Sequence, residues 1–278
     1  MVNKISKVQT ILLVILITFL GDIFILSWLP KIILSFSISI GYALDRTDLM
    51  TIYIVGSAVR LLGFFFCMVF MIKTNIIKKF NFKITPKHIL ISWMFIVYII
   101  FNIEYVDIQQ NQIPLVIAVI ISNLIIGLYE EVLFRGVVLS LLLKKWGETR
   151  KQVYLSVVFG SLVFGVFHLS NLWSGSSLVA VLTQVVYTTI MGIAFSALLL
   201  RTNNNILWCA LMHGLYNMAS GFGDITHITS TEITSTVVSI VPYILNMFMF
   251  IPLLIYGLLL LRKVNSVSFE GTVEMDHP

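Results

Sequence analysis

The sequence predicts an all-α protein, a polytopic transmembrane helical bundle of about eight spans with both termini in the cytoplasm. Hydrophobic residues make up 58% of the 278 residues and charged residues 11%, whereas soluble domains carry roughly 25% charged residues. The mean hydropathy is +0.98. In addition, apolar segments recur along the chain at a length that crosses a bilayer, and basic residues gather in alternate connections.

Each predicted span is an apolar run bounded by polar or charged residues. The third run is short, and the fourth is long enough to tilt in the bilayer or to continue into water. The spans are predicted at about 9–30, 51–73, 88–103, 113–143, 152–172, 178–200, 205–222 and 237–261.

Basic residues indicate the orientation of these spans. The positive-inside rule assigns Lys- and Arg-rich connections to the cytoplasm, and the opposite connections contain only Lys31 and Arg46 together with several acidic residues. This bias also explains the net charge of +5, so no nucleic acid partner is implied. The residues on the predicted cytoplasmic side are Lys4, Lys7, Lys73, Lys78, Lys79, Lys83, Lys87, Lys144, Lys145, Arg150, Lys151, Arg201, Arg262 and Lys263.

The chain divides into three predicted regions. Residues 1–112 hold the first three spans, residues 113–222 a core of four spans, and residues 223–278 the last span and a cytoplasmic tail. The N-terminus lacks a small-residue cleavage site, which predicts an uncleaved first helix rather than a signal peptide. We expect the polar tail after Lys263 to be disordered.

Three charged side chains, Glu130, Glu131 and Arg135, interrupt the apolar run from Ile113 to Leu143. A charge at bilayer depth costs at least about 2.5–3.5 kcal/mol, so such residues usually face the protein interior and serve function. Glu131 and Arg135 are four residues apart on one helix face and can pair. Glu130 lies about 100° around the helix and need not share the arginine. A buried structural salt bridge is the simpler alternative.

Two further spans carry polar side chains, His168 at the end of the fifth and His213 with Asn217 in the seventh. The i, i+4 spacing places His213 and Asn217 on one helix face. Polar groups this costly in lipid are expected to converge on one wet cavity. There a carboxylate could act as general base toward water, and His and Asn could stabilise an oxyanion. This set is sufficient for amide hydrolysis without a covalent intermediate.

Other polar features are given simpler interpretations. Asp22 and Arg60 lie within the first two spans and are expected to form a structural ion pair. Cys67 and Cys209 lie in apolar runs without a CxxC spacing and are expected to be buried hydrophobes. No serine stands in a G-x-S-x-G setting.

The ordered motifs resemble the CPBP family of intramembrane proteases, which includes the prenyl-protein CAAX endopeptidases and bacterial homologues. They are Glu130-Glu131-x-x-x-Arg135, Phe164-x-x-x-His168 and His213-x-x-x-Asn217, and the resemblance covers roughly residues 115–222. It implies a glutamic-type endopeptidase without a metal or other cofactor. Glu130 would activate water with His168, Glu131 would be held by Arg135, and His213 and Asn217 would stabilise the oxyanion. The two glutamates could exchange roles.

Several alternatives stay open on the sequence alone. Glutamate with two histidines is also a possible zinc site, although the H-E-x-x-H helix is absent. The resemblance also allows a non-catalytic binding or bacteriocin-immunity protein, and buried Glu and His can build a transporter's proton relay. The expected partners are the lipid bilayer and a peptide or membrane-protein substrate. The composition suits a bacterial plasma membrane, where bacteriocin maturation or immunity is one conceivable role.

Overall fold

The protein is an all-α bundle with a small C-terminal hairpin. The structure, a computed structural model, describes residues 6–39, 48–104, 108–223, 225, 241–267 and 273–275, and only the backbone of Asp22 and Lys79. Its elements are α1 (Lys7–Leu20), η2 (Gly21–Trp28), α2 (Leu29–Ser39), α3 (Leu49–Lys73), η3 (Ile76–Lys79), α4 (Pro86–Ile91), α5 (Trp93–Phe101), η4 (Gln110–Gln112), α6 (Ile113–Glu131), η5 (Val132–Leu139), α7 (Ser140–Trp146), α8 (Arg150–Phe167), η6 (His168–Ser174), α9 (Leu178–Arg201), α10 (Ile206–Gly221), α12 (Val241–Met249), α13 (Ile251–Leu261), β1 (Val264–Val267) and β2 (Val273–Met275).

Side-chain caps begin several of the long helices. The N–H of Thr51 donates to the Asp48 carboxylate at 2.8 Å at the start of α3. Thr149, Ser177 and Asn205 accept in the same way from residues of α8, α9 and α10. Each cap satisfies one of the N–H groups that a helix leaves without an intrahelical partner.

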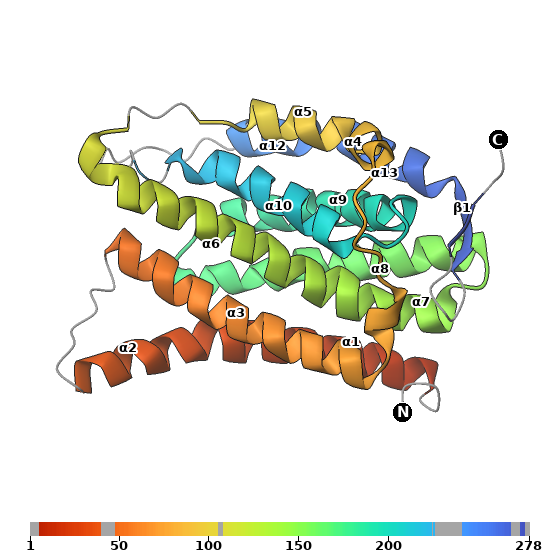
Figure 1. Cartoon of the computed structure of the whole chain (residues 1–278), viewed down its shortest axis with the longest axis horizontal. Coiled ribbons are helices and arrows are strands. Elements are labelled where there is room, and N and C mark those ends of the chain that lie inside the picture. The colour runs from red at the N-terminus through yellow and green to blue at the C-terminus, as the bar shows by residue number, and fades with distance from the viewer. Residues whose placement is uncertain are drawn as a thin grey trace.

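The long helices run along a common axis, and α6 lies at the centre of the bundle between α3 and α10 (Figure 1). On the other side, α9 packs against α8 and α13. Every residue of η5 is buried, as is the stretch of α9 from Met191 to Leu200. A helical segment that is buried on all sides belongs in the interior of a large bundle, so the core of the protein lies around these two segments.

The remaining surface is largely apolar, as expected of a protein whose outer face contacts lipid. Six helical segments are long and apolar enough to span a bilayer, among the residues that the structure describes. They are Lys7–Ser39, Leu49–Lys73, Gln110–Trp146, Arg150–Ser174, Leu178–Arg201 and Val241–Leu261.

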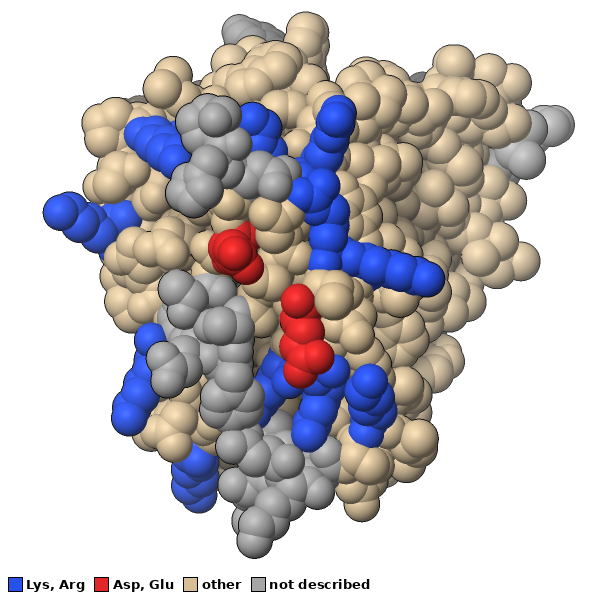
Figure 2. Space-filling model, turned by 90° about the vertical axis from the view of Figure 1, so that its right-hand side faces the viewer, with Lys and Arg blue, Asp and Glu red and all other residues tan. Residues whose placement is uncertain are grey.

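Two predicted spans differ from these six. The segment 88–103 is broken at Ser92 into α4 and α5. α10 has 16 residues and is therefore about 24 Å long, short of a hydrocarbon core of about 30 Å. The helical bundle is confirmed, whereas the count of eight spans and the cytoplasmic termini stay predictions. Lysine and arginine side chains spread over the end of the molecule that carries the hairpin, in agreement with the charge bias (Figure 2).

Two sequence-based boundaries were wrong. The first helical run continues past Pro30 to Ser39, because the π-helical segment η2 precedes Pro30 and the helix resumes from it. The tail was expected to be disordered, but Val264–Val267 and Val273–Met275 form an antiparallel hairpin. The N–H of Val267 donates to the carbonyl of Gly147 at 2.8 Å, and Val264 and Val267 are buried. These contacts join segments far apart in the sequence, so local polarity did not reveal them.

A close backbone approach fixes the α6–α10 pair. A Cβ atom on Gly127 would lie 2.5 Å from the backbone nitrogen of Gly214 and 2.7 Å from the carbonyl oxygen of Ala210. Small residues at a helix crossing let backbones approach closely inside membranes. Gly127 stands one turn before Glu131, and Gly214 follows His213 directly, so this crossing sets the distance between a carboxylate and a histidine.

We predict that Gly127→Ala destabilises the protein by about 1–3 kcal/mol, as overpacking in a core does. The matched control is Gly160→Ala in α8, where the nearest atom to the added Cβ, at 3.3 Å, is the mobile end of the Leu142 side chain. Thermal unfolding of the purified variants would measure both. Equal midpoints for the two variants would contradict the role of the crossing.

Candidate active site

Glu130 and Glu131 are the last residues of α6, directly before the π-helix η5. π-helical turns inside α-helices are frequent at functional sites. The two carboxylates point into different surroundings, as their angular separation predicts. Glu130 lines a cavity, whereas Glu131 is fully buried and does not line it. The pair therefore offers one carboxylate to the cavity and one to the protein interior.

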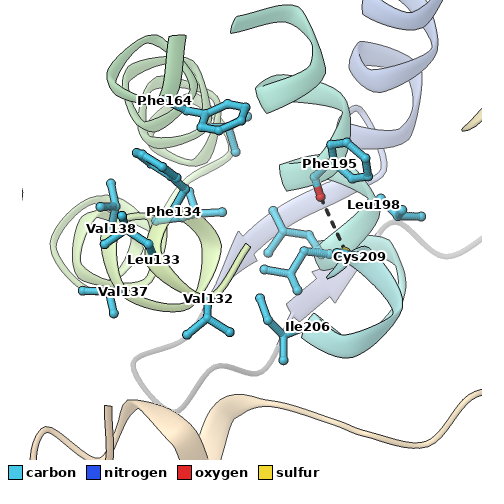
Figure 3. Packing of buried hydrophobic residues seen from close by; sticks show 14 of the residues in the cluster. Val132, Leu133, Phe134, Val137, Val138, Phe164, Phe195, Leu198, Ile206 and Cys209 are labelled. Atoms are coloured by element: carbon cyan, nitrogen blue, oxygen red, sulfur yellow. Dashed lines mark hydrogen bonds between the residues drawn. The ribbon is translucent and has the colours of Figure 1, made fainter. Parts of the chain in front are cut away.

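Arg135 lies beside Glu131, as the i, i+4 spacing predicts. Its Nη1 is 3.0 Å from Glu131 Oε1, and its Nη2 donates to the carbonyl of Gly192 at 3.3 Å. The guanidinium also lies over the ring of Phe164, 4.6 Å from its centroid. Phe164 and Phe195 belong to the apolar cluster around η5 and α9 (Figure 3). Cation–π contacts gain strength when they are desolvated, so the aromatic residues help to hold this buried charge.

His213 connects the two glutamates. Its Nδ1 lies 2.8 Å from Glu131 Oε1, and its Nε2 lies 3.6 Å from Glu130 Oε2. The imidazole stacks on Phe195 with a centroid distance of 5.1 Å and an interplanar angle of 24°. A proton on Nδ1 is donated to Glu131, which directs Nε2 toward Glu130 and the cavity. Orientation of a histidine by a buried carboxylate is a recurring feature of catalytic sites.

His168 stands at the junction between α8 and η6. Its Nδ1 lies 3.0 Å from the carbonyl oxygen of Phe164, so the proton on Nδ1 is donated to that carbonyl. In the neutral ring Nε2 is then an acceptor. The ring meets Phe164 edge-on, with centroids 5.0 Å apart. Asn217 follows His213 by one turn of α10, and both His168 and Asn217 line the same cavity as Glu130.

This cavity has a volume of about 520 Å³. Its lining contains Glu130, His168, His213 and Asn217. It also contains side chains with amide or hydroxyl groups, including Asn123, Gln184 and Thr188. A pocket of several hundred Å³ with convergent polar groups is a typical small-molecule or peptide site. It is therefore large enough for a short peptide segment and polar enough to hold water.

Part of this lining was not predicted from the sequence. Gln184 and Tyr187 come from α9, a span to which no motif was assigned, and Gln184 accepts a hydrogen bond of 2.8 Å from Asn171. A glutamine within an apolar span was the signal that could have found it. Arg60 also lines the cavity, although it was given a structural role. The side chain of Asp22, its expected partner, lies outside the described residues.

Both cysteines are buried, as the sequence predicted. Cys67 and Cys209 are both buried and unpaired thiols, and the Sγ of Cys209 lies 3.9 Å from the Phe195 carbonyl (Figure 3). Within the described part of the chain, no three His, Cys, Asp or Glu side chains are grouped as ligands of a metal ion.

Comparison with known proteins gives one match. Residues 112–219 match the family model described as type II CAAX prenyl endopeptidase Rce1-like. No curated protein and no solved structure matched the chain. The matched segment runs from the start of α6 to the end of α10 and contains both glutamates, Arg135, both histidines and Asn217. The match over this segment supports the resemblance to CAAX-type membrane endopeptidases that the motifs indicated.

Proposed function

We propose that the protein is an intramembrane endopeptidase that hydrolyses a peptide bond with a water molecule activated by Glu130. One observation carries this proposal: Glu130, His168, His213 and Asn217, from three different helices, line one cavity in an apolar bundle. The matched family supports a membrane protease, and the cavity supports the glutamate mechanism.

Glu130 and His168 are assigned to the water. The Glu130 carboxylate is almost buried but reaches the cavity, and His168 offers an unprotonated Nε2 to the same space. Water held between them would attack the carbonyl carbon of the substrate while Glu130 accepts the water proton. When the tetrahedral intermediate collapses, the C–N bond breaks and Glu130 returns this proton to the leaving amine. Atoms and charge then balance without a covalent enzyme intermediate.

His213 and Asn217 are assigned to the oxyanion. The Asn217 amide can donate directly, whereas His213 donates from Nε2 only when both ring nitrogens carry protons, because Nδ1 faces Glu131. Glu131 accepts a hydrogen bond from the Nδ1–H of His213 in either state and keeps the ring in one orientation. Donors that are already oriented cost no reorganisation during the reaction. In this assignment Glu131 and Arg135 orient His213 and do not contact the substrate.

The substrate we propose is a peptide or a membrane protein whose cleaved bond enters the cavity from the bilayer. The cavity lies among helices that carry apolar outer surfaces, which suits a substrate dissolved in the same membrane. A bacterial plasma membrane, with bacteriocin maturation or immunity as one setting, is the biological context that the composition and the family resemblance suggest.

We predict that Glu130→Gln, His168→Ala and His213→Ala each reduce cleavage about 10²–10⁴-fold, the range for losing a general base or an oxyanion donor. The assay exposes purified protein to a pool of membrane-derived peptides and reads new termini by mass spectrometry. Glu148→Gln, an exposed carboxylate outside the cavity, is the matched control and should retain cleavage. New termini that appear equally with wild type and all three variants would contradict the assignment.

A second prediction separates the two glutamates. Removing one partner of a buried ion pair leaves the other charge uncompensated and costs about 3–5 kcal/mol. Glu131→Ala should therefore lower the unfolding midpoint strongly, since Arg135 loses its carboxylate and His213 its acceptor. Glu130→Gln should abolish cleavage with a much smaller change in stability. If the two variants lost stability to the same extent, the division between base and support would be wrong.

The zinc-dependent alternative has its own test. We predict that cleavage survives exhaustive treatment with a chelator and that the purified active protein contains no stoichiometric zinc. The reason is that, among the described residues, Glu130, His168 and His213 face the cavity without being grouped closely enough to act together as ligands of one metal ion. Loss of activity on chelation, restored by added zinc, would establish the metalloprotease instead. Biological protection that survives Glu130→Gln would favour a non-catalytic binding role.

A further inference from the structure

Arg60 brings a second cation into the cavity, on the side formed by α3. The residue lies in the middle of the spanning segment Leu49–Lys73 and lines the cavity together with Glu130. Its Nη1 donates to the carbonyl of Gly56 on its own helix at 3.1 Å. Its Nε is buried and has no hydrogen-bond partner among the described residues. Most of the five N–H donors of this guanidinium therefore have no acceptor among the described residues.

The charges that line the cavity make Arg60 distinctive. Of the described lining residues, Arg60 is the only lysine or arginine and Glu130 the only aspartate or glutamate. They share the cavity without forming an ion pair within 4 Å, unlike Arg135, which contacts Glu131 directly. Arg135 does not line the cavity. The two arginines thus differ in kind: one balances a buried carboxylate, and the other faces the space in which a substrate would lie.

The chemistry of this position favours an anionic ligand. A guanidinium in a membrane span is costly, and such residues usually mark a substrate pathway or a site. Its planar fork of donors matches a carboxylate, to which it can bind through two parallel hydrogen bonds. The carboxylate of a substrate would otherwise be repelled by Glu130. A cation on the α3 side of the cavity offsets that repulsion and holds the negative group away from the base.

We propose that Arg60 is a specificity-determining residue that binds a carboxylate of the substrate, either the C-terminal carboxylate or the side chain of an Asp or Glu near the cleaved bond. The proposal rests on the proposed function, because it places this carboxylate subsite in the cavity where Glu130 acts. It implies that the enzyme selects peptide bonds that lie close to a negative charge.

The experiment uses the full-length protein in lipid nanodiscs and three sets of synthetic peptides of uncharged residues. The first set has free C-terminal carboxylates, the second has C-terminal amides, and the third has C-terminal amides with one internal Asp or Glu. Competition within a mixture gives the ratio of cleavage rates between acidic and neutral peptides. This ratio reports selectivity and is insensitive to a uniform loss of activity or of folded protein.

We expect wild type to favour acidic over neutral peptides by about tenfold or more, as a charge-assisted hydrogen bond provides. In Arg60→Gln the ratio should fall close to one, and Arg60→Lys should restore it in part, because Lys keeps the charge but not the fork. Preference for the first set identifies the C-terminal carboxylate as the ligand, and preference for the third identifies a side chain.

The matched control is Arg201→Gln. Arg201 also has a buried Nε without a hydrogen-bond partner among the described residues, but it lies at the end of α9 and does not line the cavity. Its substitution should leave the ratio unchanged. The proposal is overturned if wild type shows no preference, or if Arg60→Gln keeps it. A purely structural Arg60, paired with Asp22 for example, would lower the unfolding midpoint in Arg60→Gln and Asp22→Asn without changing the ratio.

A binding measurement distinguishes failure of this inference from failure of the proposed function. The same peptides, carrying a fluorophore, are titrated into Glu130→Gln and into the double variant Glu130→Gln, Arg60→Gln. Tighter binding of acidic peptides that disappears in the double variant supports the subsite even if wild type cuts none of the peptides. Equal binding of acidic and neutral peptides to Glu130→Gln overturns it, whatever the cleavage assay shows.

Discussion

The arrangement of the site depends on one buried carboxylate, that of Glu131. Its Oε1 lies 3.0 Å from Arg135 Nη1 and 2.8 Å from His213 Nδ1, so one oxygen joins a cation on α6–η5–α7 to an imidazole on α10. Burying an ionised group costs several kcal/mol unless charges and hydrogen bonds compensate. The aromatic rings of Phe164 and Phe195 and the Gly192 carbonyl add to this compensation around Arg135. The interaction therefore ties the orientation of His213 to the core of the bundle.

Backbone packing makes this interaction possible. Gly127 and Gly214 allow α6 and α10 to approach until a single Cβ atom would collide. At that separation short side chains, a glutamate and a histidine, span the gap without water. The costly polar groups are enclosed by apolar residues of η5 and α9, whereas the outer surface is apolar for a different reason, namely contact with lipid. In the described part of the chain, the polar groups of the candidate site are thus held inside the bundle and away from lipid.

The cavity combines groups of opposite electrostatic character. Glu130 contributes the negative charge and Arg60 the positive charge, and the lining also contains neutral donors and acceptors such as Asn123 and Gln184. A base needs an environment that does not neutralise it, and a substrate carboxylate needs a cation away from that base. Two different arginines meet these two needs. Arg135 is paired with Glu131, whereas Arg60 forms no ion pair within 4 Å among the described residues. The same residue type therefore serves two different electrostatic purposes in one bundle.

The sequence by itself determined the helical class, the central run 113–143 and the pairing of Glu131 with Arg135, because hydropathy and i, i+4 spacing are local properties. It also singled out His168, His213 and Asn217, since polar residues in apolar spans stand out. Only the tertiary structure decided that Glu130 faces the cavity while Glu131 faces His213, that Arg60 and Gln184 join the lining, and that the tail folds against Gly147. These outcomes depend on which helix faces meet, and residue spacing within one helix carries no information about its neighbours.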